Sequence, residues 1–99
     1  MRGSTLYKRG WAHTESKNYR KSITAFSDFL STYPEELRVP SALAKRALNY
    51  RSLEDYTSAL QDLNLIITNH PNSESTELAY QQIALINGQQ QDYTGMIKN

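Results

Sequence analysis

Cysteine is absent from this sequence, and proline, glycine and tryptophan are scarce. Without cysteine, no disulfide, thiolate nucleophile or thiolate metal site can form, and the redox compartment stays open. The sequence also lacks a run of about 18 apolar residues, so it predicts no membrane-spanning helix. Neither sign of charge dominates, since 11 basic residues face 10 acidic ones. That balance gives no field strong enough to indicate a nucleic acid or an anionic membrane as the partner.

Residues suited to catalysis or metal binding are equally scarce. The two histidines, His13 and His70, lie far apart in the sequence, and no HxxxH or similar ligand spacing occurs. We interpret His13 as a packing residue and His70 as a residue that ends a helix. The four glycines are isolated, so there is neither a glycine-rich phosphate loop nor the glycine pattern of a nucleophile elbow. The sequence therefore predicts no cofactor, no metal and no enzymatic activity.

What the sequence does contain is an internal repeat. Residues 18–34 align with residues 55–71 at an offset of 37 positions, so that Tyr19 falls on Tyr56. A third copy opens at the same offset with Tyr93. After the tyrosine of the first two copies, apolar residues follow at steps of four, three and four, which places them on one face of a helix. Self-similarity at a fixed period of this length predicts a solenoid of stacked units.

Each unit also carries an earlier helix. Its marker is a column of small residues, Gly10, Ala47 and Ala84, which let two helix backbones approach closely. We therefore expect all three to lie at tight helix contacts, and we expect Gly88 to end the fifth helix. The predicted helices span about 5–16, 19–32, 40–53, 56–69, 75–88 and a short one from 92. The predicted fold class is all-α, an α-solenoid of antiparallel helix-turn-helix units with a 37-residue period and about two and a half repeats.

The length of the chain fits one domain. Residues 1–4 resemble the leader of an expression vector, and the repeat domain is predicted to span 5–99. Its units are expected at about 5–37, 41–74 and 78–99, the last being cut short. We interpret the chain as a segment of a longer protein, so the absence of a signal peptide from it carries no weight.

The combined pattern resembles the tetratricopeptide repeat. That family shows a large residue, a small one four positions later, an aromatic three later, Asp or Asn followed by Tyr, and a closing proline. Here the pattern appears as LYKRGWAH…NYRKSITAF…YP and as LAKRALNY…DYTSALQDL…HP. Ser22 departs from it, since the family prefers alanine in that column, and we expect this serine to loosen the packing of the first unit. The period of 37 residues exceeds the family's usual 34 because the links between units are longer.

Long links after a Tyr-Pro ending are similar to those in the repeats of bacterial envelope proteins, notably the outer-membrane assembly lipoprotein and the periplasmic partner of the Tol–Pal system. This narrower resemblance implies a place in the periplasm or at the periphery of the outer membrane. The residues themselves carry no independent indication of the compartment.

In the tetratricopeptide family, the first helix of each unit lines a concave groove that holds a partner peptide. The resemblance places this groove at Tyr7, Trp11, Ala44, Leu48, Gln81 and Leu85, with Arg51 and Glu15 at its edge. Family members that clamp a C-terminal carboxylate place Lys, Asn and Arg in the inner columns, and none of these positions is basic here. The resemblance thus argues against a carboxylate clamp. Trp11 is expected either to anchor a partner or to fill space between first helices.

Together these features predict a non-catalytic scaffold that binds a partner protein or peptide. The alternative is a structural spacer in a longer repeat array, whose groove is filled by neighbouring protein. An RNA-binding repeat is a remote third hypothesis, because Ala44, Leu48 and Leu85 do not supply the basic inner face that such proteins need.

Two further expectations concern particular contacts. Arg46 is predicted to pair with Asp62 in its own unit, and this partly exposed pair is expected to contribute no more than about 1 kcal/mol. Arg9 lacks such a partner, because Ala25 stands at the equivalent position. The third unit is predicted to leave an apolar strip uncovered and so to support self-association. The strip comprises Leu78, Ile83, Leu85, Ile86, Met96 and Ile97.

Overall fold

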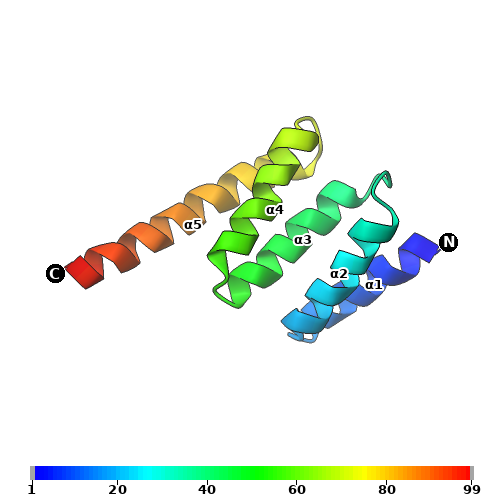
Figure 1. Cartoon of the computed structure of the whole chain (residues 1–99), viewed down its shortest axis with the longest axis horizontal. Helices are drawn as coiled ribbons and strands as arrows, with labels where there is room; N and C mark the ends of the chain where they lie inside the picture. The colour runs from blue at the N-terminus through cyan, green and yellow to red at the C-terminus, as the bar shows by residue number, and fades with distance from the viewer. Residues whose placement is uncertain (1, 99) are drawn as a thin grey trace.

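The computed structural model describes the backbone of residues 2–98 and the side chains of residues 4–88. The described backbone forms α1 (Arg2–Glu15), α2 (Tyr19–Thr32), α3 (Val39–Ser52), α4 (Tyr56–Asn69) and α5 (Ser75–Lys98), and it contains no strand. Helices α1, α3 and α5 form one layer, while α2 and α4 form the other (Figure 1). Each of the first four helices lies within a few residues of its predicted range. The predicted all-α solenoid of helix-turn-helix units is therefore confirmed.

A tight turn joins the two helices of each of the first two units. In the second turn, the N–H of Asp55 donates to the carbonyl oxygen of Tyr50 (2.9 Å), and the first turn has the same bond at the equivalent positions (2.8 Å). This bond is typical of a helix that ends through a left-handed residue, usually glycine. The left-handed residues here are Lys17, with φ 63°, and Glu54, with φ 61°. Since neither is glycine, each turn carries backbone strain of roughly 1–2 kcal/mol.

The core lies between the two layers. Helix α2 contributes Phe26 and Phe29, and α4 contributes Leu63 and Ile66, all of them fully buried. Residues three positions apart lie on the same side of a helix, so each pair faces the first-helix layer. That layer offers small residues at the contact, such as Ala47, which is also fully buried. Burying these large apolar side chains is what holds the second helix of each unit to the first.

The small-residue column behaves as predicted in two units and differently in the third. A β-carbon added to Gly10 would lie 2.8–2.9 Å from ring atoms of Phe26, so α1 and α2 approach closely only because this residue has no side chain. Ala47 is buried at the equivalent contact between α3 and α4. Ala84, by contrast, is exposed, so the prediction of a tight contact there is wrong. The reason lies in the course of α5.

Helix α5 departs from the predicted arrangement. It continues through Gly88, where the prediction ended it, and through residue 92, where a further helix was to begin. In the first two units the turn passes through a left-handed residue that is not glycine, and such a turn would be strained here too. A straight helix keeps the backbone hydrogen bonds without that strain. The far end of α5 consequently extends well beyond α3 and α4 (Figure 1).

The apolar residues of α5 divide between a packed side and an open side. Ile86 is fully buried, so the prediction that it is uncovered is wrong. Leu78 and Ile83, from the same predicted strip, are partly buried against the core because they face α3 and α4. Leu85 is 51% exposed, as predicted. Outside the described side chains lie Met96 and Ile97.

Candidate protein-binding face

We call the surface of α1, α3 and α5 that points away from α2 and α4 the inner face. Helix α3 lies beside α1 on one side and beside α5 on the other, so each repeat column forms a row of three side chains across this face. One row consists of Trp11, Leu48 and Leu85. The row three positions earlier consists of Lys8, Lys45 and Gln82. Because residues three apart lie on the same side of a helix, an apolar row and a basic-to-polar row run side by side.

The contact between Trp11 and Lys45 is the main feature of the first junction, between α1 and α3. Trp11 is 42% exposed, and the Nζ atom of Lys45 lies 3.8 Å from the centroid of its ring. Such a cation–π contact contributes about 0.5–2 kcal/mol, more as it is desolvated. Burial lowers the pKa of Lys45 from its ordinary value. Among the described side chains no carboxylate forms an ion pair with Lys45, so its ammonium is held beside an aromatic surface without a counter-ion.

Two residues of the predicted groove lie mostly inside the protein. Ala44 is buried, and Tyr7 is half-buried between α1, α2 and α3. The hydroxyl of Tyr7 lies 2.6 Å from Oγ of Ser41, and its ring packs edge-on against Phe26 and Phe29, both at 5.7 Å between centroids. These contacts join α1 to the two helices beside it. Little surface of Tyr7 or Ala44 is left for a partner.

The second junction, between α3 and α5, is built differently. Nη1 of Arg51 donates to Oε1 of Gln82 (2.9 Å), which ties α3 to α5. Leu48 is half-buried and Gln81 and Leu85 are exposed. A shallow cleft of about 370 Å³ is lined by Leu48, Arg51, Ser52, Glu54 and Tyr56. The predicted residues Trp11, Leu48 and Leu85 thus share one row, while Arg51 and Gln81 lie beside it.

Lys45 is the residue that the sequence analysis missed. The prediction used only the columns of Tyr7 and Trp11, which contain no basic residue. The signal was the column of Lys8, which places a second lysine in the next unit and Gln82 in the third. Comparing all columns on that side of the helix would have found it.

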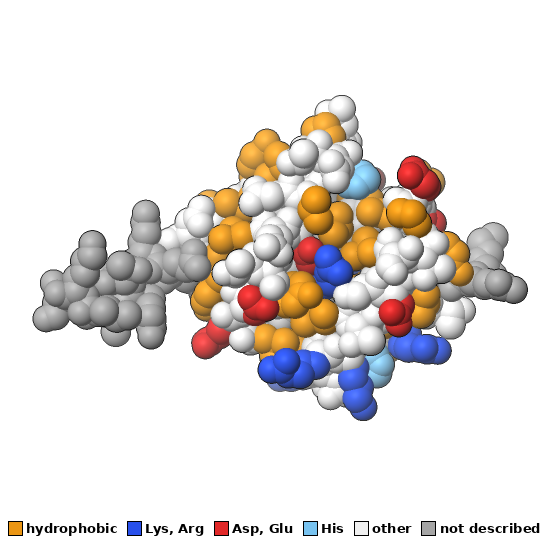
Figure 2. All heavy atoms as spheres, viewed as in Figure 1, with side chains coloured by type: hydrophobic (Ala, Val, Ile, Leu, Met, Phe, Trp, Pro, Cys, Tyr) orange, Lys and Arg blue, Asp and Glu red, His pale blue; other side chains and the backbone are white. Residues whose placement is uncertain are grey.

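The predicted pair of Arg46 and Asp62 lies in the opposite part of the molecule. Nε and Nη2 of Arg46 donate to the two carboxylate oxygens of Asp62, at 2.8 and 2.6 Å, and Nη1 donates to Oγ of Ser27 at 3.0 Å. The pairing is confirmed, but the expectation of a partly exposed pair is wrong for Asp62, whose side chain is 4% exposed. Arg46 itself is partly exposed, at 18%. On the face formed by α2 and α4, charged side chains are scattered among apolar and polar ones (Figure 2).

A buried polar cluster joins the first three helices. Oγ of Ser22 donates to the carbonyl of Gly10 and accepts from Nδ2 of Asn49, both at 2.7 Å. Ser22 and Asn49 are both fully buried, so the expected loosening by Ser22 is not found: the serine is packed and hydrogen-bonded. At the equivalent positions of the second junction lie Ala59 and Ile86, also fully buried. At equivalent positions, the first junction is therefore packed by hydrogen-bonded polar side chains and the second by apolar side chains.

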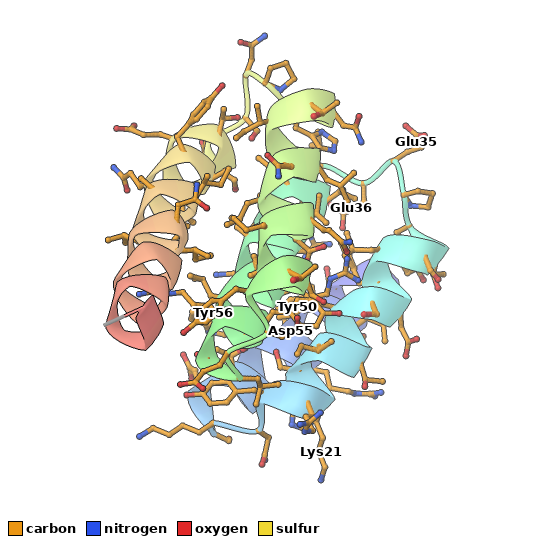
Figure 3. The ribbon with its side chains drawn as sticks, turned by 60° about the vertical axis from the view of Figure 1, so that its left-hand side comes forward. Lys21, Glu35, Glu36, Tyr50, Asp55 and Tyr56 are labelled. Carbon is orange, nitrogen blue, oxygen red and sulfur yellow. The ribbon has the colours of Figure 1, made fainter. Side chains whose placement is uncertain are left out.

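A larger cleft, of about 680 Å³, lies between the links that follow α2 and α4. On the first link, Nη2 of Arg38 lies 2.6 Å from a carboxylate oxygen of Glu36, and Leu37 is 95% exposed. The hydrogen bond from Arg38 holds the pKa of Glu36 below its ordinary value. Figure 3 shows Glu35 and Glu36 on this link, far from Tyr50 and Asp55, which lie on either side of the turn between α3 and α4. Since Arg38 is already paired with Glu36, this cleft lacks the unneutralised cation found at the first junction.

The described residues offer little for chemistry. Over the part of the chain whose side chains are described, no three His, Asp or Glu residues lie close enough together to hold a metal ion. His13 and His70 are half-buried in different units. None of the described helices is both long enough and apolar enough to cross a membrane.

Comparison with protein-family models matches the tetratricopeptide repeat at residues 4–36 and 41–73. The first segment contains most of α1 and all of α2, and the second contains most of α3 and all of α4. Together they cover two thirds of the chain. Comparison with curated proteins finds no match. Repeats of this kind generally mediate contacts between proteins. Sequence match and helical arrangement agree, and the chain belongs to the tetratricopeptide repeat family.

Proposed function

We propose that this protein is a non-catalytic scaffold that holds a segment of a partner protein against its inner face. Family membership supports a protein partner. The observation that carries the proposal is the exposure of Trp11, 42%, when Phe26 and Phe29 of the same unit are fully buried. A rigid aromatic left open on a surface of this kind is the residue type that most often anchors a partner.

The row of Trp11, Leu48 and Leu85 extends this surface across all three units. The exposed parts of these side chains offer apolar contact area to a bound segment. Arg51 and Gln81, beside the row, supply polar groups. Interfaces commonly combine an apolar centre with a polar rim, and this arrangement fits that pattern.

Selection from a random library of 12-residue peptides tests the proposal. The library is displayed as fusions through the peptide C-terminus and panned on the immobilised protein. We expect saturable binders whose synthetic, amidated forms shift the emission of Trp11, the only tryptophan, to the blue. Trp11→Ala should weaken their binding by at least about thirtyfold, or 2 kcal/mol. Its melting temperature should stay within a few degrees of the wild type, since Trp11 is only partly buried.

Tyr80→Ala is the matched control, because Tyr80 is an exposed aromatic on α5 outside the apolar row. This change should leave peptide binding unaltered. Failure to select any saturable binder, or binders that are indifferent to Trp11→Ala, would contradict the proposal and favour the alternative, a structural spacer within a longer array.

Two finer proposals accompany it. Self-association through α5 is supported by the exposure of Leu85, and sedimentation over a wide concentration range tests it. A place in bacterial envelope assembly is supported by the long links between units. Fractionation of the source cells tests this, since a product confined to the cytosol would contradict it.

A further inference from the structure

The strongest unexplained feature of the inner face is the ammonium of Lys45. It is half-buried, its pKa is lowered by burial, and none of the described carboxylates pairs with it. A desolvated charge without a counter-ion is unfavourable, and the ring of Trp11 compensates for only part of that loss. An incoming carboxylate would therefore gain more here than at a fully hydrated lysine.

The second junction shows that this position need not be charged. Gln82 stands in the column of Lys45 and is uncharged, and its amide oxygen accepts a hydrogen bond from Arg51. The other basic residues of the inner face differ from Lys45, because Arg51 donates to Gln82 and Lys8 is exposed to solvent. Among the described side chains, only the first junction combines an exposed aromatic ring with a half-buried cation that lies over it and has no carboxylate partner.

The spacing of the apolar row constrains the partner further. First helices of neighbouring units lie side by side, and packed helices are about 8–10 Å apart. Successive side chains of the row Trp11, Leu48 and Leu85 are therefore expected at roughly that interval. A bound segment with apolar side chains at a similar interval would cover the row. The acidic residues near this face, Glu15, Glu54 and Glu77, lie at helix ends or in the turn after α3 and leave its centre open.

We infer that the first junction recognises an acidic side chain flanked by apolar residues, within an internal segment of a partner protein. The carboxylate pairs with the ammonium of Lys45, and a neighbouring apolar side chain packs on the ring of Trp11. This inference rests on the proposed function and specifies its partner. The partner's carboxylate belongs to a side chain, so recognition does not require a free C-terminus.

The peptides selected above provide the test, because they are displayed through their C-termini and are synthesised as amides. We expect Asp or Glu to be enriched beside apolar residues among the binders. Lys45→Gln should weaken their binding by at least about tenfold. Lys45→Arg, which retains the charge, should recover much of the affinity. Lys21→Gln is the control, since Lys21 is an exposed lysine on α2 that points away from the helices (Figure 3).

The outcomes separate the two proposals. Binders that depend on Trp11 but show no acidic enrichment, or equal affinities for Lys45→Gln and Lys21→Gln, would overturn this inference and leave the proposed function standing. Binders that are indifferent to Trp11→Ala, or the absence of binders, would overturn both. Melting curves of each variant show whether it is folded, and Lys45→Met provides a second uncharged variant that keeps the apolar stem if Lys45→Gln does not fold.

Discussion

The guanidinium of Arg46 donates to both carboxylate oxygens of Asp62, at 2.8 and 2.6 Å, although the side chain of Asp62 is almost completely buried. The remaining amino group of Arg46 reaches Ser27 on α2. One arginine of α3 therefore connects the second helices of both units. A buried ion pair of this kind contributes little relative to an apolar pair, but losing one partner leaves the other charge uncompensated.

Arg46→Ala should therefore lower the free energy of unfolding by about 3–5 kcal/mol, well above the 1 kcal/mol expected for an exposed pair. Urea denaturation followed by circular dichroism measures this change. The matched control is Arg9→Ala, since Arg9 occupies the same column, is exposed, and faces Ala25 where Asp62 would stand. That control should change stability by less than about 0.5 kcal/mol. Equal effects of the two substitutions would show that the pair is not buried in solution.

The polar cluster of the first junction predicts a non-additive pair of substitutions. Ser22→Ala removes the acceptor for the buried amide of Asn49 and should cost about 1–3 kcal/mol. Combining it with Asn49→Ile reproduces the Ala59 and Ile86 arrangement of the second junction. The double variant should recover most of the lost stability, because removing both polar partners can be nearly neutral. A double-mutant cycle measures the coupling energy, and additive losses would refute this account of the cluster.

The small-residue column predicts opposite results in two units. Ala47→Leu should cost about 1–3 kcal/mol, because its side chain is buried between α3 and α4 and the larger one would overpack the contact. Ala84→Leu should be close to neutral, because Ala84 is exposed on α5. Thermal unfolding of both variants checks the pair. A destabilised Ala84→Leu variant would indicate that another helix covers this part of α5 in solution.

The position of Lys45 predicts a change in alkaline solution. Its folded pKa lies below its ordinary value, 10.5, so deprotonation begins at a lower pH than in the unfolded chain. Over that window the unfolded chain binds more protons, and this residue's contribution to stability rises with pH. Loss of the charge also ends the cation–π contact, so the emission of Trp11 should change in the same window. The same titration of fluorescence emission against pH is recorded for Lys45→Met. Subtracting it from the wild-type curve removes the contribution of ionising tyrosines.

The helices could be predicted from sequence because their causes are local. The steps of four, three and four after Tyr19 and Tyr56 define one helix face, and the prolines after α2 and α4 limit each helix. The contact at Gly10 was predicted from its column of small residues, and the structure shows that the side chain it meets is Phe26.

The remaining features depend on neighbours that a column does not reveal. Ala84 fits its column, yet it is exposed because α5 runs straight and does not fold back into a second helix that would cover it. The burial of Asp62 could not be predicted from its column, because its partner Arg46 also reaches Ser27 in another unit and the repeat alignment does not show this contact. The repeat alignment shows Lys45 in the column of Lys8. That Lys45 has no carboxylate partner among the described side chains becomes visible only in the folded structure. The sequence periodicity thus predicted which helix faces pack together. It did not predict which charged side chains are buried or paired.

The left-handed turns at Lys17 and Glu54 have a consequence for the order of events in folding. A turn that is strained by itself is not a place where folding begins, because its energy is recovered only when the second helix docks. Each unit should therefore pass through a state in which both helices are formed and the hairpin is still open. Helix α5 continues without a turn through the equivalent position, which is consistent with a turn that forms only when a second helix docks. We therefore expect each hairpin to close late, when Phe26 or Leu63 packs onto the first helix of its unit.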